Sequence, residues 1–237
     1  MPERLATKLA AWDWDMLQKT LDEQGFAKIP SLLDQEQCAD LIRGYEEPAH
    51  FRATIDMARY RFGVGEYRYY QAPLPGLLQN LRESLYPELA KTANRWREQL
   101  GQEAIYPSAL SAFLEHCHQQ GQTRSTPLIL RYEAGGYNCL HQDLYGNVYF
   151  PFQVVFALNQ KGDDYTGGEF LLVEQRPRMQ SRGHVITLDQ GEGLIFPTNH
   201  RPVQGTRGFY KATLRHGVST VTSGLRYTLG IIFHDAK

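Results

Sequence analysis

Residues 137–146 read Tyr-Asn-Cys-Leu-His-Gln-Asp-Leu-Tyr-Gly, and the interpretation of the whole chain starts from this stretch. One residue separates His141 from Asp143, so in a β-strand both side chains would point to the same face. An imidazole and a carboxylate placed in this way can share one metal ion. A single His-X-Asp is common in proteins, however, and becomes informative only with a third ligand from elsewhere in the chain.

Two later histidines, His200 and His216, compete for the third position. Arg226 stands ten residues after His216, whereas Tyr210 stands ten residues after His200. A guanidinium can neutralise the carboxylate of an organic co-substrate, and a phenol cannot. We therefore prefer His216 as the third ligand and place His200 in the wall of the substrate pocket.

A purely structural interpretation of these residues also exists. His216 could be a hydrogen-bonded core histidine, and Arg226 could be a buried ion-pair partner. Two histidines and one carboxylate are, however, the facial ligand set of non-haem Fe(II) oxygenases. Order, spacing and expected strand context all agree with that set, which favours the metal site.

Short segments punctuated by glycine surround these residues from about 126 onward and indicate β-strands in a sandwich or barrel. The expected strands are 127–132, 148–158, 169–174, 184–188, 193–196, 212–216 and 226–233.

Helical periodicity dominates before residue 125. We expect helices over 4–24, 35–45, 75–100 and 108–118, and one short strand over 26–30. Asp34 should cap the second helix, and Pro87 should kink or split the third. A chain of 237 residues favours one domain. The sequence thus predicts an α+β fold with a helical support region over 1–125 and a barrel core over 126–237.

The composition indicates the cellular compartment and the kinds of partner to expect. The net charge is −1 and the pI is near 6.7, so no global basic field recruits nucleic acid. No apolar run approaches the ~18 residues of a membrane helix, and the N-terminal segment lacks a secretory hydrophobic region. The three widely spaced cysteines (Cys38, Cys117 and Cys139) argue against a disulfide framework. We expect a cytoplasmic protein without a membrane partner; the oligomeric state stays open.

The chain resembles the Fe(II)/2-oxoglutarate-dependent dioxygenases, specifically their prolyl-hydroxylase-like branch. The resemblance covers about residues 126–237, with a looser match at 25–42. It is carried by Arg131-Tyr132, His141-Gln142-Asp143, Gly167-Gly168-Glu169, Gly193-Leu194-Ile195-Phe196 and His216 followed by Arg226-Tyr227.

The resemblance implies a role for each of these residues. His141, Asp143 and His216 would bind Fe(II), Arg226 would pair with the distal carboxylate of 2-oxoglutarate, and Tyr132 would hydrogen-bond the same carboxylate. It also implies a double-stranded β-helix of the jelly-roll or cupin type, with the N-terminal helices packed on its outside. With O2 as the third reactant, such an enzyme hydroxylates a C–H bond and releases succinate and CO2.

Residues 137–146 and 174–182 look closest to a bacterial family of 2OG-Fe(II) oxygenases that has been suggested to act on damaged nucleic acid bases. For the substrate pocket we name five residues, which are Asn138, Tyr137, Arg131, His200 and Arg178.

Two further segments could contact a substrate. Residues 52–70 interleave four arginines with four tyrosines, which suits a groove for single-stranded nucleic acid. The alternation of Tyr67 and Tyr69 fits an ordinary half-buried strand at least as well. Residues 171–217 hold seven cations against three acids, which suits a phosphate backbone but also a solvated face.

Three functions therefore remain open. The first is a dioxygenase that oxidatively demethylates damaged nucleic acid bases. The second is a dioxygenase of the same chemistry that hydroxylates a peptidyl proline or a small metabolite. The third is a metal-binding barrel without turnover.

Overall fold

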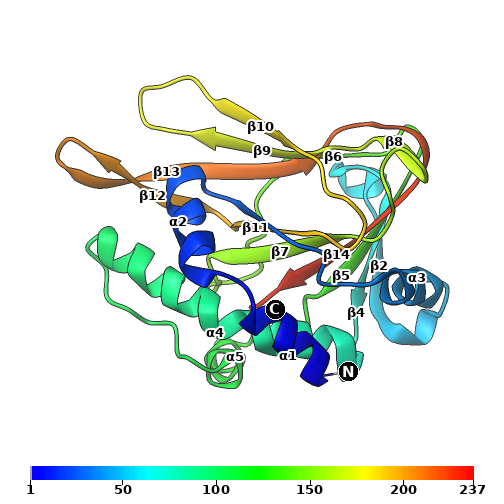
Figure 1. The fold of residues 1–237 in the computed structure, drawn as a ribbon, viewed down its shortest axis with the longest axis horizontal. Helices are drawn as coiled ribbons and strands as arrows, with labels where there is room; N and C mark the ends of the chain where they lie inside the picture. The colour runs from blue at the N-terminus through cyan, green and yellow to red at the C-terminus, as the bar shows by residue number, and fades with distance from the viewer. Residues whose placement is uncertain (1) are drawn as a thin grey trace.

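Two antiparallel β-sheets and a layer of helices make up the computed structural model, which describes residues 2–237 without the side chains of residues 2–4 and 6. Figure 1 shows the smaller sheet at the top, the larger sheet in the middle, and α1, α4 and α5 below it. The predicted combination of helices with antiparallel strands is confirmed.

The larger sheet runs in the order β1-β11-β7-β14-β5-β4-β2, and β8 pairs with β14. Its strands are β1 (Ala27–Ile29), β2 (Phe51–Asp56), β4 (Glu66–Tyr70), β5 (Leu128–Glu133), β7 (Phe152–Ala157), β8 (Tyr165–Gly167), β11 (Gly193–Pro197) and β14 (Val221–Ile232). Strands from both halves of the chain pair in it, since β1 pairs with β11 and β4 with β5.

The smaller sheet runs in the order β10-β9-β13-β6-β3, and β12 also pairs with β13. Its strands are β3 (Gly63–Val64), β6 (Tyr137–His141), β9 (Phe170–Gln175), β10 (Arg182–Ile186), β12 (His200–Gly205) and β13 (Gly208–Val218). The long strand β13 therefore pairs with β12, with β9 and with β6, the strand that carries His141.

The helices are α1 (Pro2–Ala10), α2 (Trp14–Gln24), α3 (Gln35–Gly44), α4 (Gly76–Gln99) and α5 (Leu110–Gln119), with the 3₁₀ turns η1 (Pro48–His50) and η2 (Ala58–Tyr60). None of these helices is long and apolar enough to cross a membrane.

The prediction of one helix over 4–24 was wrong, because α1 ends at Ala10 and α2 begins at Trp14. Asp13 starts the second helix by accepting a hydrogen bond from the Met16 N–H at 2.9 Å. Such a cap satisfies an amide that a continuous helix would have bonded to the preceding turn. Gly25 ends α2 as predicted, with a left-handed φ of +85°.

Two other helix signals had different outcomes. Asp34 caps α3 in a reciprocal arrangement with Gln37, as predicted. The split expected at Pro87 does not occur, and α4 runs through it.

Segment 52–70 is mainly strand, which confirms the strand interpretation of Tyr67 and Tyr69. The Arg52 guanidinium lies 4.4 Å from the centre of the Tyr69 ring, and that of Arg68 lies 4.1 Å from the centre of the Tyr45 ring. Both guanidinium groups therefore contact aromatic rings of the protein itself. The region before residue 125, which we expected to be mainly helical, contributes strands as well as helices.

Two apolar clusters hold the layers together. Aromatic side chains join the helices to the larger sheet, for example Trp96 and Phe152 at a centroid distance of 4.5 Å. A second cluster fills the space between the sheets and includes Val155, Leu172 and Leu214. Burial of such side chains contributes about 1.5–3 kcal/mol each. The layer between the sheets also holds the polar residues described next.

Candidate metal centre

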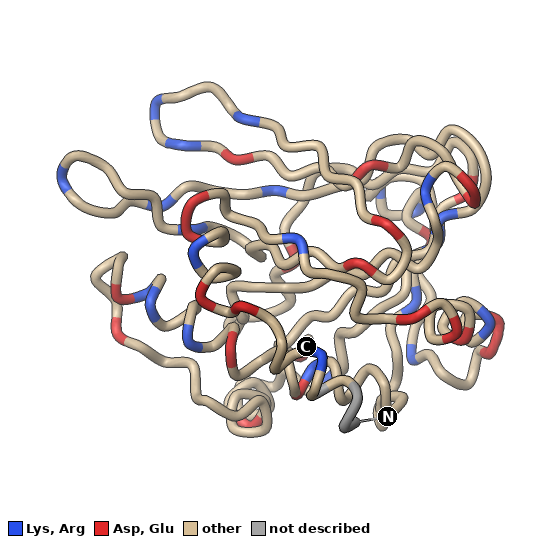
Figure 2. The backbone as a smooth tube through the Cα atoms, in the orientation of Figure 1, with Lys and Arg blue, Asp and Glu red and all other residues tan. Residues whose placement is uncertain are grey.

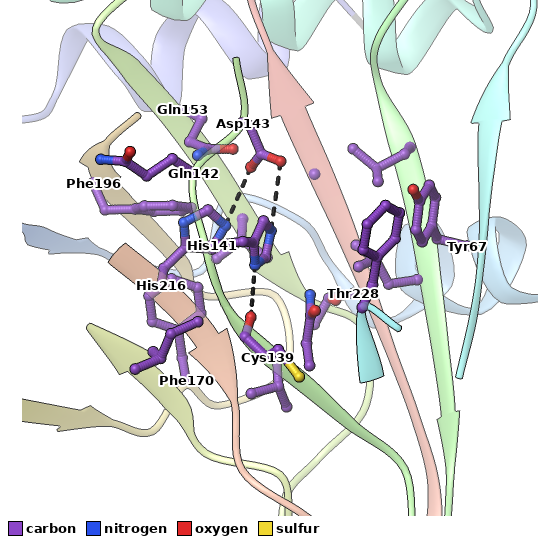
Figure 3. Close-up of a pocket in the computed structure, with 18 of the residues that line it drawn as sticks. Tyr67, Cys139, His141, Gln142, Asp143, Gln153, Phe170, Phe196, His216 and Thr228 are labelled. Atoms are coloured by element: carbon purple, nitrogen blue, oxygen red, sulfur yellow. Dashed lines mark hydrogen bonds and ion pairs between the residues drawn. The ribbon is translucent and has the colours of Figure 1, made fainter. Parts of the chain in front are cut away.

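His141, Asp143 and His216 point toward one another between the sheets (Figure 3). Their potential ligand atoms all lie within 4.8 Å of one another. His141 Nε2 is 3.5 Å from Asp143 Oδ1, and His216 Nε2 is 3.2 Å from Asp143 Oδ2. Two imidazoles and one carboxylate at this separation can hold one metal ion.

Strand pairing explains how residues 75 positions apart in the chain meet. His141 is the last residue of β6, and its register partner on β13 is His216. Asp143 lies beyond the end of β6, so the two-residue spacing works there without a continuing strand. The two histidine rings have a centroid distance of 4.2 Å.

Neighbouring groups orient the ligands. His141 Nδ1 lies 2.8 Å from the Cys139 carbonyl, to which its N–H can donate, and this leaves Nε2 free to face Asp143. The Tyr145 hydroxyl donates to Asp143 Oδ1 at 2.6 Å. Gln142 Nε2 lies 2.8 Å from the Leu214 carbonyl and 2.9 Å from that of Asn199, which ties the loop after β6 to the strands beside it.

The charges within the site suit a metal ion. Burial opposes ionisation of Asp143, but hydrogen bonds and charge from His141 and His216 outweigh it and hold the pKa of Asp143 well below its usual value. Burial and the neighbouring His141 lower the pKa of His216. The site therefore offers an ionised carboxylate and, at His216, a neutral imidazole, which are the protonation states that metal ligands need. At His141 burial lowers the pKa, but the hydrogen bond and charge of Asp143 outweigh it and raise the pKa, so a bound metal ion would have to displace a proton there.

A cavity of about 330 Å³ opens onto the three ligands and extends to Arg226 and Tyr132. This volume lies in the range of small-molecule sites. Phe170 and Phe196 flank His216 and line the same cavity, with ring centroids 5.8 and 4.8 Å from the His216 ring.

Arg226 and Tyr132 present unsatisfied polar atoms to this cavity. Both side chains are buried, and among the described residues Arg226 Nε, Arg226 Nη1 and Tyr132 Oη have no hydrogen-bond partner. Burial raises the pKa of Tyr132 to about 12, so its hydroxyl stays protonated and can donate. Asn138 stands near enough to that hydroxyl to lower the pKa but makes no hydrogen bond of normal geometry with it.

A buried guanidinium without an anion is costly, and a carboxylate that accepts two of its hydrogen bonds removes that cost. The distal carboxylate of 2-oxoglutarate fits this requirement. The turn after β8 shapes the position, because a Cβ on Gly168 would lie 2.8 Å from Arg226 Cδ. The donor set and the orphaned cation thus fit the iron and the co-substrate together.

Sequence reasoning did not single out two polar residues of the cavity, Thr228 and Gln153. Thr228 lies two residues after Arg226 on β14, and Gln153 lies on β7 with a buried, unpartnered Nε2. Tyr67 lines the cavity from β4. The period of two along β14 could have indicated Thr228, and one polar residue inside the apolar run Phe152–Ala157 could have indicated Gln153.

Of the five residues named for the substrate pocket, only Asn138 lines this cavity. Arg131 and Tyr132 are consecutive on β5 and face opposite ways, so Arg131 instead donates to the Tyr227 hydroxyl at 3.1 Å. Tyr137 is exposed at the start of β6, and His200 begins β12 opposite Thr213. Arg178 lies in the connection between β9 and β10.

The basic stretch 171–217 divides into two parts. Glu174 pairs with Arg176 at 2.6 Å and with the buried Arg201 at 2.5 Å, so these two arginines are structural. The other cations lie along the projecting arms β9–β10 and β12–β13 and along β13, where Figure 2 shows few acids. A local basic surface therefore exists, but outside the cavity.

Comparison with known proteins places this site in a family. A family model described as "Oxygenase, catalysing oxidative methylation of damaged DNA" (Oxygenase-NA) matches residues 65–236. A Mycobacterium tuberculosis protein, named Rv2227 in one strain, is 49% identical over 181 residues, which cover 74% of this chain and 78% of the relative.

Solved structures share the fold at low sequence identity. A 2OG-Fe(II) oxygenase family oxidoreductase from Burkholderia pseudomallei has a TM-score of 0.54 and 14% identity, covering 95% of this chain and 93% of its own. A Trichoplax adhaerens prolyl hydroxylase, solved with a fragment of hypoxia inducible factor, has a TM-score of 0.58 and 16% identity, covering 97% and 91%.

The matched family is one of oxygenases, and the fold is that of 2OG-Fe(II) oxygenases. Together they imply Fe(II) as cofactor with 2-oxoglutarate and O2 as co-substrates. The family model spans well over half of the chain, and the mycobacterial relative covers almost three quarters of it. The chain therefore belongs to the Oxygenase-NA family and is an oxidoreductase.

Proposed function

We propose that this protein is an Fe(II)- and 2-oxoglutarate-dependent dioxygenase that removes N-methyl groups from damaged nucleic acid bases. The proposal rests on one cavity that contains both a set of metal-ligand residues and a site for an anion. Three metal-ligand side chains and a buried arginine without an anion line the same cavity. The family description supports a damaged base as the substrate.

Each residue has a defined task in this proposal. His141, Asp143 and His216 would hold Fe(II), and the cavity beside them would admit the small-molecule co-substrates. Arg226 grips the distal carboxylate of 2-oxoglutarate bidentately, and Tyr132 donates to the same carboxylate. Phe170 and Phe196 keep water away from His216.

Fe(II), with 2-oxoglutarate and O2 as co-substrates, would supply the oxidation that places one oxygen atom of O2 in a C–H bond and the other in succinate, with loss of CO2. On an N-methyl group the product is a hydroxymethyl amine, which breaks down to the free base and formaldehyde.

The two sheets would be the halves of a double-stranded β-helix, with the iron site between them and the helices outside. Residues 1–237 would act as one domain, since β1 and β4 pair directly with strands of the second half. Free thiols at Cys38, Cys117 and Cys139 support a reducing, cytoplasmic location.

A turnover screen tests the function. Purified protein with Fe(II) and 2-oxoglutarate is offered N-methylated DNA or RNA oligonucleotides, the same oligonucleotides without methyl groups, or proline-containing peptides. The proposal requires succinate and formaldehyde in equal amounts from a methylated oligonucleotide only, and none from the Asp143→Ala variant. Hydroxylated peptide without formaldehyde would contradict it.

A further inference from the structure

We propose that residues 59–62, Arg-Tyr-Arg-Phe, form a stacking platform that selects single-stranded nucleic acid at the mouth of the cavity. We call this segment the mouth platform. The inference rests on the proposed function, because it names the form of nucleic acid that the same site admits.

Two exposed aromatic rings form the centre of the mouth platform. Tyr60 is 50% exposed and Phe62 is 47% exposed. Their ring centroids lie 5.6 Å apart and the ring planes differ by only 19°. Exposed parallel rings of this kind offer flat faces on which unpaired bases can stack, irrespective of sequence.

Strand pairing fixes the mouth platform beside the metal ligands. The Phe62 carbonyl accepts a hydrogen bond from the Cys139 N–H at 2.8 Å, and Gly63 pairs with Asn138 on β6. Residue 63 must be glycine, because a Cβ there would lie 2.2 Å from the Tyr137 carbonyl oxygen. Since β6 ends in His141, the rings are held at a set position relative to the iron site.

The mouth platform also borders the cavity itself. Arg61 and Phe62 line it together with His141 and Asp143. Arg61 has a φ of +60°, which is uncommon for a residue with a side chain. Bases stacked on Tyr60 and Phe62 would therefore continue directly into the cavity that holds the reacting group.

Charge favours nucleic acid over other partners. Arg59 and Arg61 are exposed, and in the part of the chain that the structure describes neither guanidinium has a hydrogen-bond or ion-pair partner. On the flanking strands, the Arg52 guanidinium lies over the Tyr69 ring and the Arg68 guanidinium lies over the Tyr45 ring. Two free cations beside two rings match alternating phosphates and bases. A peptide could use the rings but offers no regular anions.

The depth of the site favours a single strand. Asp143 is 8% exposed and His216 is 7% exposed, so the reacting group must enter the cavity. A base inside a duplex must first leave the stack, which costs a few kcal/mol, whereas an unpaired base does not bear that cost in full. The flat platform also needs base faces that a duplex keeps covered.

Binding of a fluorescein-labelled oligonucleotide, single-stranded or annealed to its complement, tests the inference without any turnover. We expect wild-type protein to bind the single strand more tightly than the duplex. Phe62→Ala and Tyr60→Ala should each weaken single-strand binding roughly 5- to 150-fold, the range for loss of one stacked base. Phe62→Trp should retain binding, and Phe62→Leu should lose it, because leucine keeps apolar volume but has no π face.

Two further variants distinguish binding at the mouth platform from binding elsewhere on the surface. Arg61→Ala should lower the slope of log Kd against log salt by about 0.7, the value for one phosphate contact on a single strand. Phe209→Ala removes a ring that is 40% exposed on β13, away from the cavity, and should leave single-strand binding unchanged. Circular dichroism of each variant checks that it is folded.

The outcomes distinguish failure of this inference from failure of the proposed function. If methylated oligonucleotides are demethylated but the platform variants bind like wild type, the inference is overturned and the function stands. Tighter binding of the duplex, or equal loss in Phe209→Ala, also overturns it. If the platform variants instead lose binding of a proline-containing peptide while no oligonucleotide binds or turns over, both proposals fail.

Discussion

Arg226 on β14 and Tyr132 on β5 are register partners, and each turns an unsatisfied buried donor toward the cavity that holds the three metal-ligand residues. The guanidinium carbon lies 5.5 Å from the centre of the Tyr132 ring. Two donors from neighbouring strands at one level of a sheet make a preformed site for an anion. This relationship supports the proposal that a carboxylate co-substrate binds beside the metal centre.

Replacement of Arg226 should separate co-substrate binding from iron binding. Each charge-assisted hydrogen bond contributes about 1.5–3 kcal/mol, so Arg226→Ala should raise the Kd for 2-oxoglutarate at least roughly tenfold. Arg226→Lys should recover only part of the affinity, because an ammonium cannot grip both oxygens in the same plane. Calorimetric titration of the iron-loaded variants measures this.

The matched control is Arg131→Ala, on the neighbouring strand but facing the Tyr227 hydroxyl. Its 2-oxoglutarate affinity should equal that of wild type. Unchanged affinity in Arg226→Ala would remove the assignment of the anion site.

Tyr145 should tune the metal site through Asp143. Its hydroxyl donates to Asp143 Oδ1 at 2.6 Å, and loss of such an orienting hydrogen bond typically reduces metal affinity about 10- to 100-fold. Tyr145→Phe should therefore bind Fe(II) more weakly in a chelator competition. Tyr149→Phe, in the same loop, serves as the control. Equal iron affinity in all three proteins would show that the hydroxyl does not support the ligand.

The Glu174–Arg201 pair should dominate the stability of the β9–β13 region. Both side chains are almost completely buried, and Arg201 Nε donates to Glu174 Oε2 at 2.5 Å. Glu174→Ala leaves a buried cation without its partner and should lower the free energy of unfolding by about 3–5 kcal/mol.

Glu88→Ala breaks an exposed pair with Lys91 and should cost no more than about 1 kcal/mol. Urea unfolding of both variants compares them. Similar losses at the two sites would contradict the importance of burial.

His234 should make stability depend on pH. Burial lowers its pKa from an ordinary 6.5 to about 4. Between these values the unfolded chain binds a proton that the folded chain does not, so stability is complete above pH 6.5 and falls as the pH drops toward 4. The full effect is on the order of 3 kcal/mol.

In His234→Gln this part of the slope should disappear. The measurement is the free energy of unfolding at several pH values between 4 and 7. A variant with the same slope as wild type would assign the pH dependence to other groups.

The convergence of His141, Asp143 and His216 could be predicted because ligand chemistry restricts the residue types and the resemblance supplied their order along the chain. The spacing of Arg226 after His216 led us to expect it at the same site, and it lines the same cavity; its pairing with 2-oxoglutarate stays a prediction. Which strands pair was not predictable, since long-range packing sets the partners, and so the alignment of Arg226 with Tyr132 emerged only from the fold. Arg131 was misplaced because a shift of one residue along β5 changes the face on which a side chain lies.

Local signals also had limits in the first half of the chain. Asp13 is a cap residue of the same type as Asp34, but Met16 stands three residues after it where Gln37 stands three residues after Asp34, and the apolar spacing across residues 4–24 concealed the break. In segment 52–70, composition alone could not separate Arg52 and Arg68, which stack on internal rings, from Arg59 and Arg61, which face solvent. The fold places Arg52 and Arg68 on strands β2 and β4, and it places Arg59 and Arg61 in the exposed connection between these strands.

A shared iron and 2-oxoglutarate centre is tested most directly by calorimetric titration of 2-oxoglutarate into the protein under anaerobic conditions, with and without Fe(II). We expect one 2-oxoglutarate to bind per chain, with affinity that requires iron and is lost in both His216→Ala and Arg226→Ala. Equal binding to the metal-free protein and to His216→Ala would contradict a shared iron and 2-oxoglutarate centre.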